Sequence, residues 1–145
     1  QIAEKIWAGE QPAWRLDAKK AAGLAGNLTW EDKVKGPQVC EPEILGDFIV
    51  VRKGIGASYH LSVVVDDAAQ EIDLVVRGED LFRVTHVHRL LQALLDLPTP
   101  VWHHHDLVLD SDGKRLAKRT KATTLKDLRH EGWTPEQVRR AVGFG

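Results

Sequence analysis

The stretch that decides the fold runs from residue 72 to residue 110 and reads IDLVVRGEDLFRVTHVHRLLQALLDLPTPVWHHHDLVLD. Ile72 to Arg77 is rich in β-branched residues and predicts a strand. Thr85 is typical of a helix N-cap, and the apolar spacing after it predicts a helix from His86 to Leu95. Val101 to Asp110 is a second extended segment. Strands that alternate with a helix predict an α/β layer with parallel strands, in which ligands bind at the carboxyl ends of the strands.

The chain before this stretch is less regular. Gln1 to Gly9 is typical of the end of a helix, and Lys19 to Gly36 is expected to be irregular because glycine and asparagine interrupt it. Alternation predicts a short strand at Ala13 to Asp17, and Phe48 to Arg52 has the composition of a strand. Tyr59 to Gln70 is ambiguous, since its consecutive valines favour a strand while its length and polar end favour a helix.

The composition is that of an ordinary globular domain. Of 145 residues, 43% are hydrophobic and 28% are charged, and the net charge of −1 excludes a uniformly basic nucleic-acid coat. No apolar run approaches the about 20 residues of a membrane helix, and no secretory signal is visible, so no membrane partner is expected. Cys40 is the single cysteine, which excludes an internal disulfide and favours the reducing cytoplasm. The chain starts at Gln1 and contains no methionine, so we expect that its N-terminal part is missing.

A basic segment follows the stretch that decides the fold. Asp110 to Gly113 is a turn signal, and between Lys114 and Arg129 the chain has seven cations and one anion, Asp127. Such a segment is either a solvated loop and helix face or a site for phosphate or RNA. Two short helices are expected after the basic loop, at Leu125 to His130 and at Thr134 to Val142.

Two residues are candidates for binding a polar substrate. Arg77 ends a predicted strand, and its planar guanidinium can offer two parallel hydrogen bonds to a carboxylate. The alternative is that Arg77 pairs with a local acid, Glu79 or Asp80. Tyr59 follows a Gly-Ala-Ser turn, and its hydroxyl is a candidate for orienting a substrate. The alternative for Tyr59 is a half-buried packing residue.

Other chemical patterns are incomplete. The triplet His103 to His105 would place two imidazoles on one face of a strand, but no cysteine and no helical His spacing completes a metal site. One or two of these histidines are instead expected to be packed and hydrogen bonded. Asp66 and Asp67 point to different faces of either a helix or a strand, and no G-x-S-x-G sequence supports a serine hydrolase.

Three segments together resemble the glutamyl-tRNA synthetase family of class I aminoacyl-tRNA synthetases. They are Ala57–Ala68 (ASYHLSVVVDDA), Val75–Leu81 (VVRGEDL) and Gly113–Arg119 (GKRLAKR). Their order and spacing are most similar to the short branch of that family, the glutamyl-queuosine tRNA(Asp) synthetases. The resemblance covers the chain from about Ala13 to Gly145.

The resemblance implies a fold and an activity. Residues 1–110 would be the second half of a Rossmann-type catalytic domain, with a helix at Tyr59 to Gln70. Residues 111–145 would hold the signature loop and a small helical region that contacts the tRNA stem. Members of the family activate glutamate with ATP and Mg²⁺ and transfer it to tRNA, in the short branch to queuosine of tRNA(Asp). The resemblance therefore implies a cytoplasmic glutamate-activating ligase.

The resemblance also implies roles for individual residues. Tyr59 and Arg77 fall on the tyrosine and the arginine that contact glutamate. Lys118 falls on the catalytic second lysine of the signature loop, which contacts ATP, and Arg115 supplies a further positive charge for ATP. Arg77 and Lys118 are expected to converge around one cavity. The loop comprises Arg115, Leu116, Ala117, Lys118 and Arg119, of which Ala117 departs from the family pattern by lacking a hydroxyl.

The segments that carry the first half of such a site do not occur in this sequence. There is no HIGH-type segment and no cysteine cluster for the zinc that many relatives hold in their N-terminal part, so no metal site is expected here. We expect the 145 residues alone to hold half of an active site and to be inactive, and the protein to be monomeric. The alternatives are a part of a full-length glutamyl-tRNA synthetase, a non-catalytic synthetase-like module, and an unrelated nucleotide-binding α/β protein.

Overall fold

The computed structural model describes residues 9, 12–109, 113, 116 and 123–143. The chain divides into two compact units, residues 1–105 and residues 106–145. Apart from Gly9, the helix expected at Gln1 to Gly9 lies outside the described residues. No helix in the described part of the chain is long and apolar enough to span a bilayer.

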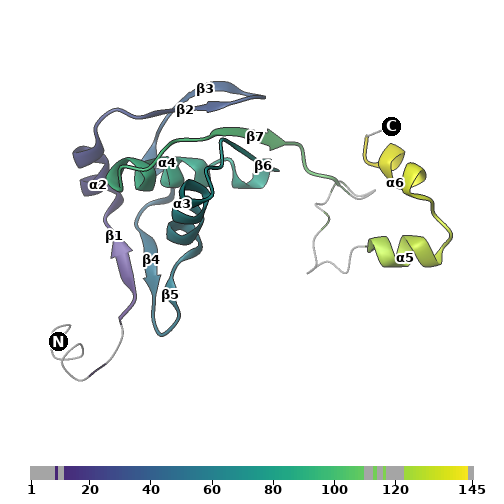
Figure 1. The fold of residues 1–145 in the computed structure, drawn as a ribbon, viewed down its shortest axis with the longest axis horizontal. Helices are drawn as coiled ribbons and strands as arrows, with labels where there is room; N and C mark the ends of the chain where they lie inside the picture. The colour runs from purple at the N-terminus through teal and green to yellow at the C-terminus, as the bar shows by residue number, and fades with distance from the viewer. Residues whose placement is uncertain (1–8, 10–11, 110–112, 114–115, 117–122, 144–145) are drawn as a thin grey trace. The chain divides into compact units, whose positions relative to one another are not determined.

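The first unit is built on a four-stranded sheet (Figure 1). β6 (Leu74–Gly78) and β7 (Val101–His105) are parallel to each other. β2 (Thr29–Asp32) is parallel to β7 on its other side, and β3 (Gly36–Val39) pairs with β2 as an antiparallel hairpin. The sheet order is therefore β3-β2-β7-β6. The α/β layer expected from the strand–helix–strand stretch is confirmed, with an antiparallel strand added at one edge.

A smaller antiparallel sheet accompanies it. β4 (Phe48–Arg52) is the central strand and pairs with β1 (Trp14–Leu16) and with β5 (Gly56–Ala57). The strands expected at Ala13 to Asp17 and at Phe48 to Arg52 are therefore confirmed. Gly54, in the turn between β4 and β5, has a φ of 70°, which glycine adopts without a steric penalty.

The expectation of an irregular segment from Lys19 to Gly36 is wrong. α2 (Ala18–Ala25) begins where the Asp17 side chain accepts a hydrogen bond from the Lys20 backbone N–H at 2.9 Å. It ends at Gly26, whose φ of 71° lies in the left-handed region. The hairpin of β2 and β3 follows. The polar and glycine residues that indicated a loop are therefore the ends of regular elements.

α3 (Tyr59–Ala69) makes the ambiguous segment a helix, as the family resemblance implies. The Ser58 side chain accepts a hydrogen bond from the Leu61 backbone N–H and caps the first turn. Val64 is 2% exposed, whereas Val65 is 43% exposed, so neighbouring valines lie on different faces of the helix. Burial of Val64 offsets the weak helix preference of β-branched residues.

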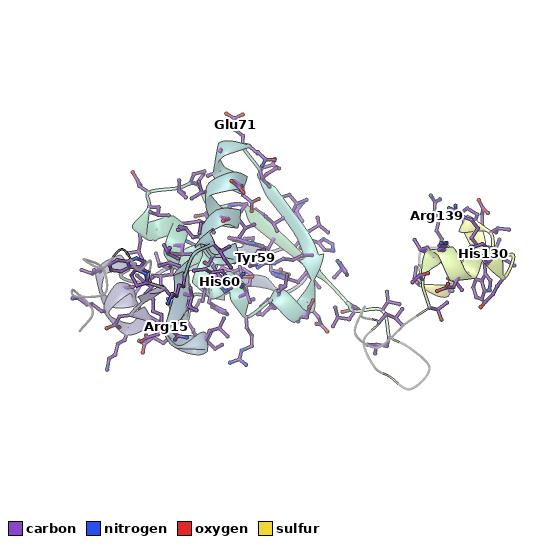
Figure 2. All side chains as sticks on the ribbon, turned by 90° about the horizontal axis from the view of Figure 1, so that it is seen from below. Arg15, Tyr59, His60, Glu71, His130 and Arg139 are labelled. Carbon is purple, nitrogen blue, oxygen red and sulfur yellow. The ribbon has the colours of Figure 1, made fainter. Side chains whose placement is uncertain are left out.

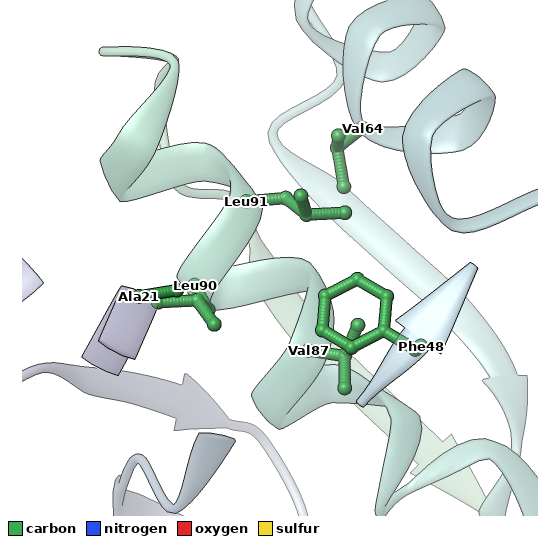
Figure 3. Packing of buried hydrophobic residues seen from close by; sticks show 6 residues of the cluster. All are labelled: Ala21, Phe48, Val64, Val87, Leu90 and Leu91. Atoms are coloured by element: carbon green, nitrogen blue, oxygen red, sulfur yellow. The ribbon is translucent and has the colours of Figure 1, made fainter. Parts of the chain in front are cut away.

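α4 (Val84–Leu94) lies between α2 and α3 and contacts both (Figure 1). The N-cap expected at Thr85 is wrong, because the helix starts one residue earlier and Thr85 is fully buried in its first turn. Val87, Leu90 and Leu91 form the centre of the apolar core (Figure 3). The core is completed by Ala21 of α2, Phe48 of β4 and Val64 of α3.

The second unit contains, among its described residues, two short helices at the expected positions. They are α5 (Leu125–His130) and α6 (Pro135–Ala141), capped by Thr124 and Thr134. Each threonine forms a capping box with the residue three positions later, in which both side chains accept backbone N–H groups. These bonds are local in sequence, which explains why the helix starts are predictable.

Candidate active site

Arg77 and His104 meet at the carboxyl end of the parallel strands. Arg77 lies opposite His104 in the register of β6 and β7, and each is the last residue but one of its strand. Paired residues of neighbouring strands project to the same face of a sheet. The Arg77 Nε–H donates to His104 Nε2 at 3.0 Å. The strand end that the sequence indicated as a ligand site thus holds a guanidinium beside an imidazole.

The Arg77 guanidinium is anchored by neutral groups. Its Nη1 lies 3.2 Å from His88 Nδ1, and its Nη2 donates to Thr85 Oγ1 at 2.6 Å and to the Leu81 carbonyl at 3.3 Å. With the bond to His104, these contacts engage four of the five guanidinium N–H groups. Neutral partners hold the guanidinium in place without cancelling its charge, so the group still attracts an anion.

The two acids considered as alternative partners for Arg77 are Glu79 and Asp80, and they differ in their contacts. Glu79 pairs with Lys35, at 3.4 Å between Oε2 and Nζ. Burial is the largest influence on the pKa of Arg77 and lowers it. The Tyr59 side chain, which is hydrogen bonded to Arg77, raises this pKa, and so do the carboxylates of Asp67 and Asp80.

Tyr59 is the first residue of α3 and borders the same cluster, and Figure 2 shows it beside His60. The Tyr59 side chain is 49% exposed. The centroid of its ring lies 5.7 Å from that of His88 and 5.6 Å from that of His60. Since His88 also contacts Arg77, the half-exposed Tyr59 side chain and the anchored guanidinium lie at one polar cluster. Such a pair can bind a polar, negatively charged ligand.

Asp32 and His104 form a buried pair behind Arg77. Asp32 Oδ2 lies 2.6 Å from His104 Nδ1, and both side chains are 0% exposed. Asp32 Oδ1 accepts hydrogen bonds from the backbone N–H groups of Val34 and Lys35, each at 2.9 Å. Burial raises the pKa of Asp32, but these hydrogen bonds, that of His104 first, outweigh it and hold the pKa below its usual value. Burial lowers the pKa of His104, so the pair is a carboxylate and a neutral imidazole.

A second pair of imidazoles lies on the other side of Arg77. His60 Nδ1 lies 3.3 Å from His88 Nε2. Burial, together with the charges of Arg77 and His60, lowers the pKa of His88 to about 3. Burial and Arg77 also lower the pKa of His60. Both rings are neutral near pH 7, which allows His88 Nδ1 to accept a hydrogen bond from Arg77.

The sequence matches one known family along nearly its whole length. Residues 4–144 match the family described as tRNA synthetases class I (E and Q), catalytic domain. The chain belongs to this synthetase family. The family resemblance and the fold class expected from the sequence are both confirmed.

Relatives of this synthetase chain include proteins named for glutamate. The chain is 54% identical over 138 residues to the glutamyl-Q tRNA(Asp) synthetase of Rhodobacter capsulatus, a match that covers 92% of this chain and 50% of that protein. It is 33% identical over 130 residues to glutamate--tRNA ligase 2 of Syntrophus aciditrophicus, which covers 90% of this chain and 26% of that one. The crystal structure of a glutamate tRNA ligase from Elizabethkingia meningosepticum is similar with a TM-score of 0.57 and 25% identity, over 75% of this chain and 20% of that one. The chain thus spans half the length of the R. capsulatus relative.

Most of the segment expected to be the signature loop lies outside the described residues, namely Arg115, Ala117, Lys118 and Arg119. Leu116 is described, and its backbone N–H donates to the Val108 carbonyl at 3.1 Å. The convergence of Arg77 and Lys118 around one cavity therefore stays a prediction.

The histidine triplet contributes to the polar cluster around Arg77 through its middle member. His104 is 1% exposed and hydrogen bonded, whereas His103 is half-buried and His105 is exposed. In the part of the chain that the structure describes, no group of three His, Cys, Asp or Glu side chains is arranged to hold a metal ion.

Five residues of the site were not indicated as such by the sequence: Asp32, His60, Thr85, His88 and His104. Asp32 lies in the segment expected to be irregular, and Thr85 was expected to be a helix cap. His88 lies in a helix whose pattern indicated only an apolar face. One sequence signal was available, since alignment of the two predicted strands at their carboxyl ends places Arg77 beside the histidine triplet.

Proposed function

We propose that the protein that contains this chain activates glutamate with ATP and transfers it to tRNA. The observation that carries the proposal is the Arg77 guanidinium, held by neutral partners at the carboxyl end of β6 with the Tyr59 hydroxyl beside it. Membership of the class I family supports the reaction, and the relatives named for glutamate support the substrate.

Arg77 would bind a carboxylate of glutamate mainly by its charge. Four of its N–H groups contact His104, His88, Leu81 and Thr85, and Tyr59 is a further hydrogen-bond partner. The carboxylate would therefore be attracted by the charge of Arg77 and receive the O–H of Tyr59, in place of the two parallel N–H bonds expected from the sequence. An analogue without the carboxylate leaves these donors unpaired, which can discriminate by roughly 10⁴-fold.

Adenylate formation would need the signature loop as well. A carboxylate oxygen of glutamate attacks the α-phosphorus of ATP, and the bond to the departing pyrophosphate breaks. Lys118, with Arg115, would stabilise the negative charge on the pyrophosphate, and Mg²⁺ would enter with ATP. Loss of one such positioned donor typically costs on the order of 10²–10³ in rate. Residues 1–110 and 111–145 would thus be two functional parts that together supply half of the active site.

As acceptor we propose queuosine of tRNA(Asp), in a monomeric protein of the cytoplasm. The 54% identity to the R. capsulatus protein supports this choice. The second candidate is an ordinary glutamyl-tRNA synthetase, which the 33% identity to the S. aciditrophicus ligase favours. The two differ in whether activation needs tRNA: activation without tRNA indicates the queuosine enzyme, and an absolute requirement for tRNA indicates the ordinary one.

The test is glutamate-dependent ATP–pyrophosphate exchange by the protein that contains this chain, with and without tRNA. We expect exchange in the absence of tRNA. Lys118→Ala should reduce the exchange rate on the order of 10²–10³-fold with little change in glutamate affinity. Arg77→Ala should raise the KM for glutamate first.

Arg15→Ala is a matched control for Arg77→Ala. Arg15 is an exposed residue of β1 that donates to the Asp47 carbonyl at 3.2 Å, away from Tyr59 (Figure 2). It should leave the KM for glutamate unchanged. Absence of glutamate-dependent exchange under both conditions would overturn the proposal.

A further inference from the structure

His104 is bonded on both sides of its ring, and the two bonds require one tautomer. Its Nδ1 lies 2.6 Å from Asp32 Oδ2, and its Nε2 receives the Arg77 Nε–H at 3.0 Å. An ionised carboxylate only accepts hydrogen bonds, so Nδ1 must carry the proton. The Arg77 Nε–H only donates, so Nε2 must present its lone pair. The ring is therefore neutral with its proton on Nδ1.

Asp32 is itself held so that it cannot turn away. Its Oδ1 caps the turn after β2 through the backbone N–H groups of Val34 and Lys35, while its Oδ2 also receives the His104 backbone N–H at 3.3 Å. Its side chain is fully buried, and its hydrogen bonds keep it ionised. The carboxylate thus presents a fixed acceptor to His104.

The remaining hydrogen bonds of Arg77 hold the two Nη nitrogens of its guanidinium. Nη1 lies 3.2 Å from His88 Nδ1, which accepts its N–H. The other ring nitrogen of His88, Nε2, then carries the proton and faces His60 Nδ1 at 3.3 Å. Nη2 donates to the Thr85 hydroxyl at 2.6 Å. Each of the three guanidinium nitrogens therefore has a protein acceptor. The hydrogen bond of Nε forms only when His104 carries its proton on Nδ1.

We propose that Asp32 and His104 are positioning residues for Arg77, a carboxylate–imidazole pair that orients the guanidinium toward a substrate carboxylate. The proposal rests on the proposed function, in which Arg77 binds glutamate. Asp32 selects the tautomer of His104, His104 accepts the Arg77 Nε–H, and the guanidinium is held next to Tyr59. A guanidinium already oriented loses less conformational entropy on binding than a mobile one.

Asp32→Asn separates this role from simple packing. The amide has nearly the same shape, and its oxygen can still accept the Val34 and Lys35 N–H groups. Its NH₂ group would donate to His104 Nδ1, which moves the ring proton to Nε2. Two donors, the Nε2–H of His104 and the Nε–H of Arg77, would then face each other. The shape of the buried pair is kept, but the His104 backbone N–H also loses its acceptor, and the Nε–H of Arg77 loses its anchor.

The experiment uses the protein that contains this chain, labelled with ¹⁵N-histidine, together with exchange kinetics. We expect the His104 resonances to show the Nδ1-protonated tautomer in the native protein and the Nε2-protonated tautomer in Asp32→Asn. The KM for glutamate should rise by about tenfold or more, as for a lost hydrogen bond to a charged group, while the KM for ATP stays unchanged. In an Arg77→Ala background, Asp32→Asn should have no further effect on the KM for glutamate.

Asp47→Asn is the matched control. The Asp47 Oδ1 accepts the Ala18 backbone N–H at 3.0 Å, so the change also alters a carboxylate that binds backbone, at another place. It should move neither the tautomer of His104 nor the KM for glutamate.

The outcomes separate the two proposals. If Arg77→Ala leaves the KM for glutamate unchanged, the proposed function of Arg77 fails. If Arg77→Ala raises this KM but Asp32→Asn shifts the tautomer without raising it, only the positioning proposal fails. If Asp32→Asn does not fold, the native protein alone decides: an Nε2-protonated or doubly protonated His104 at neutral pH overturns the positioning role.

Discussion

The apolar core is buried and the polar cluster around Arg77 is partly buried, and both are built on α4. The helix contributes Val87, Leu90 and Leu91 to the core, and Thr85 and His88 to the cluster. Apolar burial is non-directional and scales with area, so core residues need only fit. Buried polar groups cost free energy unless each finds a partner, so cluster residues need specific partners at specific angles.

This difference predicts that mutations in the core and mutations in the cluster have different effects. A change in the core should lower the free energy of unfolding and leave substrate affinity intact in the molecules that fold. A change in the cluster should alter substrate affinity by more than its effect on stability implies. The four predictions below test this division, in order of decreasing expected effect.

Leu90→Ala should cost the most stability. The Leu90 side chain is 0% exposed at the centre of the core. Removal of a buried leucine side chain typically lowers the free energy of unfolding by about 2–5 kcal/mol. Urea unfolding measures this loss, with Leu24→Ala as the control because Leu24 of α2 is 76% exposed. Equal losses in the two variants would contradict the assignment of the core.

Thr85→Val should cost less stability but should change substrate binding. Valine keeps the shape of threonine and removes the hydroxyl that accepts the Arg77 Nη2–H at 2.6 Å. A buried donor left without its acceptor costs about 1–3 kcal/mol. The KM for glutamate should rise, measured by exchange kinetics, whereas Thr29→Val at an exposed position of β2 should change neither quantity. A loss of stability with an unchanged KM would place Thr85 with the core instead.

His88→Gln should reduce the pH dependence of stability. The pKa of His88 is about 3 in the folded protein against 6.5 for an ordinary histidine. Between these values the unfolded chain binds a proton that the folded chain does not, so stability falls as the pH falls below 6.5. The slope from this one group is about 1.4 kcal/mol per pH unit.

Urea midpoints between pH 7 and pH 4 measure that slope in the native protein and in His88→Gln. Histidines 60, 86 and 104 also have lowered pKa values and contribute with the same sign, so a smaller slope remains in the variant. An unchanged slope would show that His88 is accessible to protons in the folded protein.

Glu79→Gln should have the smallest effect. Glu79 pairs with Lys35 at 3.4 Å, and both side chains are 41% exposed. Exposed ion pairs contribute about 0–1 kcal/mol, and salt screens them. Urea unfolding at low and high salt checks this expectation. A loss larger than that of Thr85→Val would mean that this pair belongs functionally to the buried cluster.

Elements with local causes were predictable from the sequence. The strand at Ile72 to Arg77 and the helix after it follow from composition and apolar spacing, and α5 and α6 follow from their threonine caps. The segment from Lys19 to Gly36 was missed because a glycine inside a helix and a glycine after it look alike in sequence. The start of α4 was missed because a threonine in a first turn has the composition of a cap.

The amino-acid order alone established a cation at the end of a strand, a tyrosine at the start of a helix, and the segments that mark the synthetase family. These follow from periodicity and local motifs. The partners of Arg77 were decided by the tertiary fold, since Asp32 and His104 lie 72 positions apart and meet only because β2 and β7 are neighbours. A hydrogen bond depends on distances of a fraction of an ångström, and no local pattern specifies such distances between segments so far apart in the chain.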